Sequence, residues 1–441
     1  MNNCKSITIK PQTIIGYGQM EKYGDWGLGN GSALPMGKRG CQMKKFVKKY
    51  YVIISLMLVY FAVNFDKGLI GMAIIPIRER FGLSATQAGF MMSAYSLGYA
   101  VVSLPGGWIA DKLGYKRVLI ACLTLATICT IIFPFASVLV LFITIRFLMG
   151  FSQGSVPSAT TKGIALNYEK EKRVMIQSVW FVSQNIAGFA ATYIGARIIA
   201  INYQYAYWTA AILYVIVLLL IWKTLPNIKA VEKTEKDKTR VKVSDVFKDR
   251  NMWIFAICIF VFNLILNGSN NWYATFLSTH FNRDMVDIGN ILSLSSLISI
   301  GCSPITGIML SKVFKGRENW FIFFSTIITG ILYIVMVKGN VLMVSVLCIY
   351  MAAYTSMFPF VAIKTLPQKL ISEQYIGTTM GVITAVSSFG GFVAPTMIGA
   401  ILDAGGGEFE NAFFALSALG VCAGTVALFG LKLPKENRKD A

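Results

Sequence analysis

Long apolar segments recur along the chain, separated by short polar stretches. Each has about 20 residues or more, the length that a helix needs to cross the hydrocarbon core of a bilayer. The apolar residues run continuously instead of alternating, which disfavours a membrane β-barrel. The pattern predicts an all-α integral membrane protein with twelve transmembrane helices, over residues 50–76, 86–110, 117–136, 139–164, 174–199, 205–224, 251–276, 286–311, 319–337, 341–363, 375–401 and 411–432.

A long charged segment after the sixth apolar segment divides the chain into two halves of six helices each. The first 42 residues are polar and glycine-rich, and they lack the apolar core of a signal peptide. We expect Met43 to be the natural start of the chain. The predicted organisation is a disordered cytoplasmic tail (1–47), an N-terminal half (48–225), a cytoplasmic linker (226–250), a C-terminal half (251–432) and a cytoplasmic tail (433–441).

Composition and charge agree with a membrane protein. The 441 residues are 55% hydrophobic and only 14% charged, and the mean hydropathy is +0.60. The net charge of +20 is unevenly placed: 33 of the 41 Lys and Arg residues lie toward one side of the predicted membrane and five toward the other. This is the positive-inside pattern, with both termini cytoplasmic. The positive charge therefore sets topology, and we expect no nucleic-acid partner.

Cysteine and histidine usage predicts neither a metal site nor a cofactor. The eight cysteines are scattered and form no Cys-x-x-Cys pair, and the single histidine, His280, lies in a predicted external loop. The chain has no paired intramembrane aspartates, no His-Glu-x-x-His motif and no Ser-Lys dyad. An intramembrane enzyme or a sensor is therefore disfavoured.

The segment Gly-Trp-Ile-Ala-Asp-Lys-Leu-Gly-Tyr-Lys-Arg, residues 107–117, is a short basic loop between the second and third predicted helices. Its spacing, its apolar flanks and its place in the chain resemble the signature loop of the major facilitator superfamily. The resemblance implies two six-helix halves that rock about a central site, with this loop closing the cytoplasmic side in the outward-facing state. The implied gating residues are Gly107, Asp111, Lys112, Gly114, Lys116 and Arg117.

Three ionisable residues fall inside predicted helices: Asp66 and Lys67 in the first and Arg146 in the fourth. Charges within a membrane are expensive and mark candidate functional sites. If Asp66 neutralises one cation, a single positive charge remains, which suits a monoanion such as a carboxylate. Asp66 is also the candidate proton carrier, because a carboxylate that loses its neighbouring cation to the substrate takes up a proton more readily. The alternative is a structural ion pair that joins the two helices.

Further motifs resemble the anion:cation symporter family, which includes sugar-acid permeases and sialin-like carriers. They are Asn64-Phe-Asp-Lys-Gly-Leu-Ile-Gly71, Leu83-Ser-x-x-Gln-x-Gly89, Leu104-Pro-Gly-Gly-Trp108, Arg146-Phe-Leu-x-Gly150 and Pro395-x-x-x-Gly399 with Leu402-Asp403. The resemblance covers about residues 48–430.

The resemblance implies a set of substrate-binding residues. Lys67 and Arg146 match the family's basic pair, Tyr99 a substrate-contacting tyrosine and Gln184 a polar contact. Thr384 and Ser388 stand where the eleventh helix usually offers polar groups. The alternative for each taken singly is helix–helix hydrogen bonding or core packing. A polar-aromatic cluster in the seventh helix completes the set: Asn270, Asn271, Trp272 and Tyr273.

Two positions depart from the family pattern. Gln153 stands where the family usually has a proton-coupling glutamate, and glutamine does not titrate. Lys364 stands where an acidic residue commonly precedes the proline matched by Pro367. We expect Lys364 to extend its ammonium to the lipid headgroups; the alternative is an extension of the anion path.

The predicted function is a secondary active transporter for a small organic anion, a sugar acid or other monocarboxylate. We expect proton-coupled uptake by alternating access, by a monomer in the cell membrane. One alternative is an uncoupled facilitator or exchanger of organic anions. Another is a multidrug exporter of the same fold, which is disfavoured because residues 180–196 contain no Gly-Pro motif and because a cation-rich site suits anions.

Overall fold

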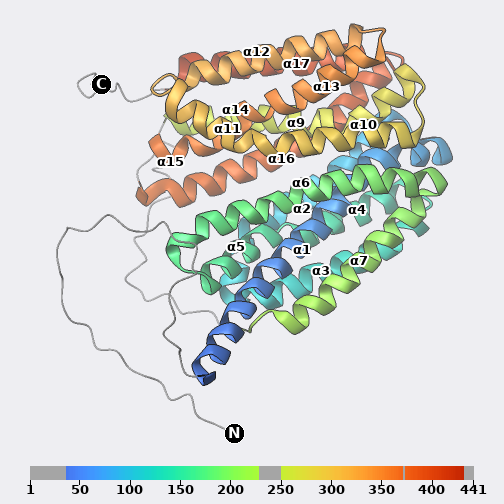
Figure 1. Cartoon of the computed structure of the whole chain (residues 1–441). Helices are drawn as coiled ribbons and strands as arrows, with labels where there is room; N and C mark the ends of the chain where they lie inside the picture. The colour runs from blue at the N-terminus through green and yellow to red at the C-terminus, as the bar shows by residue number, and fades with distance from the viewer. Residues whose placement is uncertain (1–35, 228–249, 371–372, 432–441) are drawn as a thin grey trace. The chain divides into compact units, whose positions relative to one another are not determined.

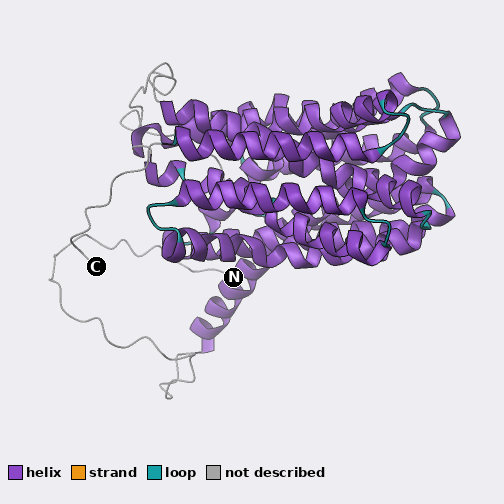
Figure 2. Cartoon of the chain, turned by 90° about the horizontal axis from the view of Figure 1, so that it is seen from above, coloured by secondary structure: helices purple, strands orange, loops and turns teal. Residues whose placement is uncertain are grey.

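The structure, a computed structural model, describes residues 36–227, 250–370 and 373–431. These residues form helices joined by short loops, with no strand among them (Figure 2). Most of the predicted tails and linker lies outside the described residues. The first helix is described from Met36, so residues 36–47 are helical, whereas the sequence predicted them to belong to a disordered tail.

Twelve helical segments fill the described ranges, and the predicted positions of all twelve agree with them. Ten are long and apolar enough to cross a membrane; α2 and α6, of 29 and 32 residues, are not among those ten. The segments are α1 (Met36–Phe81), α2 (Ala85–Leu113), α3 (Tyr115–Ile132) with η1 (Phe133–Phe135), α4 (Leu139–Gln153) with α5 (Val156–Asn167), α6 (Lys170–Ile201), α7 (Tyr203–Thr224), α9 (Arg250–Phe281), α10 (Met285–Ile298) with η3 (Ser299–Gly301), α11 (Cys302–Ile308) and η4 (Met309–Val313), α12 (Glu318–Lys338), α13 (Leu342–Thr355) with α14 (Met357–Thr365) and α15 (Pro367–Leu370), α16 (Glu373–Ala404), and α17 (Phe409–Gly430).

Three of the predicted continuous helices are interrupted. The fourth breaks between α4 and α5, the eighth between α10 and α11, and the tenth between α13 and α14. In each case a proline lies in the first turn after the break: Pro157, Pro304 and Pro359. Proline has no N–H to donate to the preceding turn and its ring crowds that turn, so a helix bends or restarts there. The hydropathy pattern does not register these breaks, because the apolar run continues through them.

The described residues from Lys48 onward form one compact unit. Within it, helices α1–α7 lie in one layer and α9–α17 in the other, as Figure 1 shows. The layers meet mainly along α2 against α16 and along α6 against α10. Glycines allow the backbones to touch: a Cβ on Gly89 would collide with the carbonyl of Pro395, and one on Gly399 with the carbonyl of Ala85.

Close backbone packing also joins α2 to α4. A Cβ on Gly98 would collide with the carbonyl of Phe147, and one on Gly150 with the carbonyl of Tyr95. The two helices therefore approach each other at two levels, which brings the α4 face that bears Arg146 against the α2 face that bears Tyr95.

We predict that Gly150→Ala destabilises the protein, because the added methyl group forces α4 away from α2. Overpacking of this kind costs about 1–3 kcal/mol or more. The midpoint of thermal unfolding of the purified protein should fall clearly. Gly381→Ala is the matched control, since nothing lies within 4 Å of a Cβ at that helical glycine. Equal midpoints for the two variants would contradict the packing argument.

Candidate functional site

A buried polar cluster joins four helices of the first layer. Gln153 of α4 donates from its Nε2 to an Asp66 carboxylate oxygen (2.9 Å) and to the Tyr214 hydroxyl (2.9 Å). Its Oε1 accepts from the Tyr95 hydroxyl at 2.5 Å. The Tyr214 hydroxyl in turn donates to the same oxygen of Asp66 at 3.2 Å. Asp66 is 0% exposed and Gln153 1%, so α1, α2, α4 and α7 share one hydrogen-bond network away from solvent.

The predicted basic pair lies beside this cluster, around the ring of Tyr95. The Arg146 guanidinium lies 4.9 Å from the ring centroid and the Lys67 ammonium 5.9 Å from it. Arg146 is 1% exposed, and its Nε and Nη1 have no hydrogen-bond partner. Lys67, although in the middle of α1, is exposed. Two cations from two helices therefore face the same aromatic ring.

The expected ion pair between Asp66 and a cation is not formed within the described residues. The ion pairs found there join Lys162 to Asp111, Lys172 to Glu169 and Arg283 to Asp287. Asp66 bonds neutral donors on one oxygen, and its other oxygen, Oδ1, has no hydrogen-bond partner. The reason is geometric: Gln153 lies seven residues after Arg146, on the same face of α4, and takes the position nearest the carboxylate.

Tyr99 and Gln184 extend this face of the first layer. The ring of Tyr99 stacks on that of Tyr95 with centroids 6.3 Å apart. Gln184 is exposed, and its Oε1 accepts from the Tyr60 hydroxyl at 2.8 Å. Tyr60 also stacks on Trp180 at 4.0 Å. Tyr60 was not among the predicted site residues, although it stands seven residues before Lys67 on the same face of α1, and that spacing was the available signal.

The residues predicted as a polar-aromatic cluster in α9, Asn270 to Tyr273, do not lie on one face of the helix. Trp272 is buried and its Nε1 donates to the Pro395 carbonyl at 3.3 Å, and Tyr273 is buried and stacks on Phe413. These two rings point into the second layer in this conformation, so the structure does not bring them together with Arg146 and Lys67. Four consecutive residues span more than one turn of helix and cannot share a face. Asn270 is exposed, and Asn271 donates to the carbonyl of Asn267.

A polar stripe that the sequence analysis missed runs along α9. Asn263, Asn267 and Asn271 recur at intervals of four residues, which places them on one face. Asn263 donates to the carbonyl of Ser387 in α16, and Asn267 donates to the Asn263 side chain at 2.9 Å. The interval of four within an apolar segment was the available signal.

Thr384 and Ser388 lie one turn apart in α16 and are partly accessible. Their hydroxyls donate to carbonyls of their own helix, of Met380 and of Thr384. A hydroxyl bonded in this way keeps its lone pairs free to accept another hydrogen bond.

Lys364 of α14 is half-buried, and its ammonium lies 4.2 Å from the ring centroid of Phe360. The expected extension of this side chain toward the headgroups stays a prediction, as does the alternative of an extension of the anion path.

The basic loop is a tight connection that is held within the first layer. Gly114 ends α2 and precedes α3 with φ 86°, a conformation that favours glycine. Asp111 accepts from the Lys162 ammonium at 2.7 Å, and Lys162 also donates to the Ala110 carbonyl. The Lys116 ammonium bonds the carbonyls of Trp222 and Leu225 at the end of α7.

The remaining residues of the loop make fewer contacts in this conformation. The Lys112 ammonium lies 5.1 Å from the ring centroid of Trp108, and Arg117 is exposed. Nothing lies within 4 Å of a Cβ added to Gly107, whereas one added to Gly106 would lie 2.9 Å from the hydroxyl oxygen of Ser155.

The opposite end of the bundle holds the two layers together through Asp403. This carboxylate, at the end of α16, accepts the N–H groups of Ala85 (2.9 Å) and Thr86 (2.8 Å) and the Thr86 hydroxyl (2.6 Å). Ala85 and Thr86 begin α2, where unpaired N–H groups and the helix dipole favour an anion. A cavity of about 220 Å³ adjoins it, lined in part by Arg78 and Thr279. We call this the Asp403 end and the end with the basic loop the Asp111 end.

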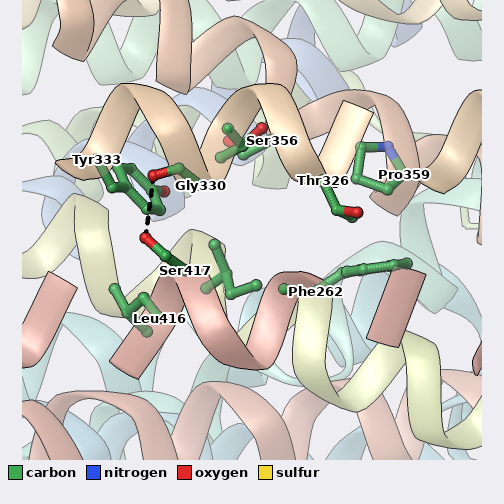
Figure 3. A pocket seen from close by; sticks show the side chains of 11 residues that line it. Phe262, Thr326, Gly330, Tyr333, Ser356, Pro359, Leu416 and Ser417 are labelled. Carbon is green, nitrogen blue, oxygen red and sulfur yellow. Dashed lines mark hydrogen bonds between the residues drawn. The ribbon is translucent and has the colours of Figure 1, made fainter. Parts of the chain in front are cut away.

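A second cavity lies inside the second layer, between α9, α12, α14 and α17 (Figure 3). Its volume is about 10 Å³, room for little more than one water molecule. Ser417 donates across it to the carbonyl of Gly330 at 3.1 Å, and no charged side chain lines it. It is too small and too neutral to hold an organic anion. In the part of the chain that the structure describes, no group of three or more His, Cys, Asp or Glu side chains is placed to hold a metal ion.

Comparisons with known proteins agree with this architecture. A probable sulfoacetate transporter of Cupriavidus necator is 21% identical over 86% of this chain and 93% of its own length. A hexuronate transporter of Bacillus subtilis is 20% identical over 85% and 93%. Among solved structures, a bacterial homologue of the human lysosomal transporter Spinster has 16% identity and a TM-score of 0.71, covering 86% of this chain and 94% of that one.

The family comparison decides the classification. The sequence profile of the Major Facilitator Superfamily matches residues 56–395, more than half of the chain. Proteins of this family are transporters and not enzymes. With its two layers of helices, its basic loop between α2 and α3 and its buried charges, the chain belongs to the Major Facilitator Superfamily.

Proposed function

We propose that this protein is a secondary active transporter of a small organic anion, with sugar acids and other carboxylates as the substrate class. The observation that carries the proposal is the Arg146 guanidinium, which is buried and has two N–H-bearing nitrogens without a partner. A buried donor without a partner is costly, and a carboxylate satisfies a guanidinium with two parallel hydrogen bonds. Lys67, whose ammonium lies 5.9 Å from the centroid of the same Tyr95 ring, adds a second positive charge.

The substrates named for two relatives support the same class, since sulfoacetate and hexuronates are organic anions. A multidrug exporter of the same fold is less consistent with the site, because two cations around Tyr95 repel cationic drugs. We place the protein as a monomer in the cell membrane, with the Asp111 end and both termini cytoplasmic. The excess of Lys and Arg on that side supports this orientation.

Alternating access accounts for the difference between the two ends. Among the described residues, the hydrogen bonds between the layers lie toward the Asp403 end: those of Asp403, that of Ser93 with Thr396 and that of Arg197 with Asn290. Asp111 meanwhile bonds Lys162 of its own layer. We infer a conformation closed at the Asp403 end, from which the layers rock so that the basic loop closes the Asp111 end.

We propose that Asp66 couples proton movement to transport. It is the carboxylate of the buried cluster, and its Oδ1 has no partner. Gln153, which has no titratable group, fixes the other oxygen. Because Gln153 carries an amide, Asp66 is the one carboxyl of the network. If Asp66 carries no proton during transport, the protein is an uncoupled exchanger of organic anions, which is the second candidate function.

Arg146→Ala should abolish binding of organic anions, because it removes the two-pronged partner of the carboxylate. We expect the stabilisation of the protein by hexuronates, aldonates or aldarates in a thermal-shift screen to disappear, since binding to the folded state raises its stability. Arg283→Ala, at an exposed ion pair with Asp287, is the control and should retain the shift. An unchanged apparent affinity of Arg146→Ala would exclude a substrate role.

Asp66→Asn should stop accumulation driven by a pH gradient while preserving exchange. The amide keeps the hydrogen-bonding shape of the cluster but cannot carry a proton. Uptake into proteoliposomes with an imposed pH gradient, compared with counterflow at equal pH, measures the two activities. Asp287→Asn, at the exposed ion pair, should leave both intact. Gradient-driven uptake at the parental level in Asp66→Asn would favour the second candidate function.

Asp403→Ala should open the Asp403 end, because the first N–H groups of α2 lose their acceptor. A cysteine introduced at Thr279, in the cavity at that end, should then react faster with a membrane-impermeant maleimide, once the native cysteines are replaced. Asp284→Ala is the control, because the Asp284 side chain caps α10 within the second layer by accepting the N–H of Asp287. The same labelling rate in all three proteins would rule out Asp403 as a latch.

A further inference from the structure

Three buried hydroxyl groups of α3 and α7 have no hydrogen-bond partner, and the site described above uses none of them. They belong to Thr130 of α3 and to Tyr203 and Tyr207 of α7. Thr130 and Tyr207 are 0% exposed and Tyr203 is 3% exposed. Leaving a buried polar group without a partner is costly, and valine or phenylalanine would fill the same space without that cost. The hydroxyls therefore call for an explanation other than packing.

The two tyrosines share one face of α7 with Tyr214. Tyr203, Tyr207 and Tyr214 follow one another at intervals of four and seven residues, which places them on the same side of a helix. The Tyr214 hydroxyl bonds Asp66, whereas Tyr203 is the first residue of the helix. At a rise of about 1.5 Å per residue, Tyr207 lies about 6 Å along the axis from Tyr203 and about 10 Å from Tyr214. This face therefore carries hydroxyls from the level of Asp66 to the start of α7.

The outer end of this row of hydroxyls lies at the Asp403 end of the bundle. Arg80, an exposed residue in the last turn of α1, has its guanidinium 6.0 Å from the centroid of the Tyr203 ring. Five residues later α2 begins at Ala85, whose N–H bonds Asp403. An exposed cation therefore connects the row to the surface at that end.

Thr130 lies between Tyr207 and the level of Asp66. Helix α3 packs along α7 (Figure 1), and the ring of Phe133 at its end lies 4.2 Å from the ring of Tyr207. Because α3 begins at the Asp111 end, Thr130, three residues before Phe133, lies one turn deeper on the same side of the helix. The Thr130 hydroxyl therefore divides the longer step from Tyr207 to Asp66.

Asp66 offers an acceptor at the inner end of the row. Gln153 and Tyr214 bond its Oδ2, whereas its Oδ1 is buried without a partner. A proton can be added to Oδ1 without breaking a bond of the buried cluster. The charged and titratable side chains that act on Asp66 or are acted on by it are Tyr95 of α2, Cys129 of α3, Arg146 of α4, and Tyr207 and Tyr214 of α7.

We propose that Tyr203, Tyr207 and Thr130 form a proton route from the Asp403 end to Asp66, completed by water molecules between them. The inference rests on the proposed proton coupling by Asp66, and it adds the path by which the proton arrives. A water molecule that bonds two groups spans about 5.6 Å, because each of its hydrogen bonds is about 2.8 Å long. The spacing of about 6 Å between Tyr203 and Tyr207 suits one such bridge.

The transfer along this route leaves every hydroxyl unchanged. Each hydroxyl oxygen accepts a proton from the water before it and releases its own proton to the water after it. The last water gives its proton to Oδ1 of Asp66, which becomes neutral. A substrate carboxylate at Arg146 favours this step, because it offsets the positive charge that otherwise favours the ionised form of Asp66.

The route is separate from the path of the substrate. Its groups belong to α1, α3 and α7 of the first layer, so rocking of the two layers leaves it in place, whereas Arg146 and Lys67 face the ring of Tyr95. Beyond Asp66 the Oδ2 oxygen is held by Gln153 and Tyr214, so the route ends at this carboxyl in the present conformation. Protons therefore reach Asp66 from the Asp403 end while that end is closed to the substrate.

The test replaces Tyr203 and Tyr207 together by phenylalanine, which removes both hydroxyls and keeps both rings. Uptake into proteoliposomes driven by a pH gradient is compared with counterflow at equal pH, with D-glucuronate, D-gluconate and D-glucarate as probes and an entrapped pH-sensitive dye to follow proton entry. Thr130→Val is the second variant. Tyr205→Phe is the matched control, because Tyr205 is an exposed tyrosine of the same helix.

We expect gradient-driven uptake and proton entry to fall about tenfold or more in the double variant, as is typical when a positioned proton-transfer group is lost. Counterflow should stay at the parental rate, since it needs no net movement of protons, and Tyr205→Phe should change neither activity. The midpoint of thermal unfolding of the double variant should not fall, because the two hydroxyls have no partner to lose.

Parental gradient-driven uptake in both the double variant and Thr130→Val would overturn the route, and so would an equal fall of uptake and counterflow. If Asp66→Asn still stops gradient-driven uptake in either case, the proposed coupling through Asp66 stands without the route. A parent protein that takes up none of the three probes in response to a pH gradient would overturn the proton coupling and the route together.

Discussion

The burial of charge among membrane-spanning helices is the constraint on which the rest of this structure depends. Arg146 and Asp66 are both withdrawn from solvent, yet they do not neutralise each other directly. Gln153 and Tyr214 hold the carboxylate, and the ring of Tyr95 lies against the guanidinium. Separate neutral partners keep the two charges near each other without pairing them, so the guanidinium remains available to a ligand.

Close packing of helices makes that arrangement possible. Gly98 and Gly150 let α4 lie against the backbone of α2, which fixes Arg146 and Gln153 beside Tyr95. Without a hydrophobic driving force between helices in lipid, such small-residue contacts and a few buried hydrogen bonds position the side chains. The polar cluster and the glycine contacts therefore serve the same purpose: they hold Arg146 and Lys67 of the first layer at the ring of Tyr95.

The two ends of the bundle use the same chemistry in different ways. At the Asp403 end a carboxylate of the second layer receives the first N–H groups of α2, and so joins the layers. At the Asp111 end a carboxylate pairs with Lys162 of its own layer. The proposed rocking movement would break the few bonds of Asp403 with the start of α2 and leave the contacts within each layer in place.

The sequence by itself determined the number and places of the membrane helices, the basic loop after α2 and the three ionisable residues of the first layer. These follow from hydropathy, charge asymmetry and the cost of charge in a membrane, which act locally along the chain. Only the tertiary structure decided which side chains meet. It turned Trp272 and Tyr273 into the second layer and joined Gln153 to Asp66. Those outcomes depend on how each helix is rotated and where it breaks, and rotation is fixed by contacts between segments that lie far apart in the sequence.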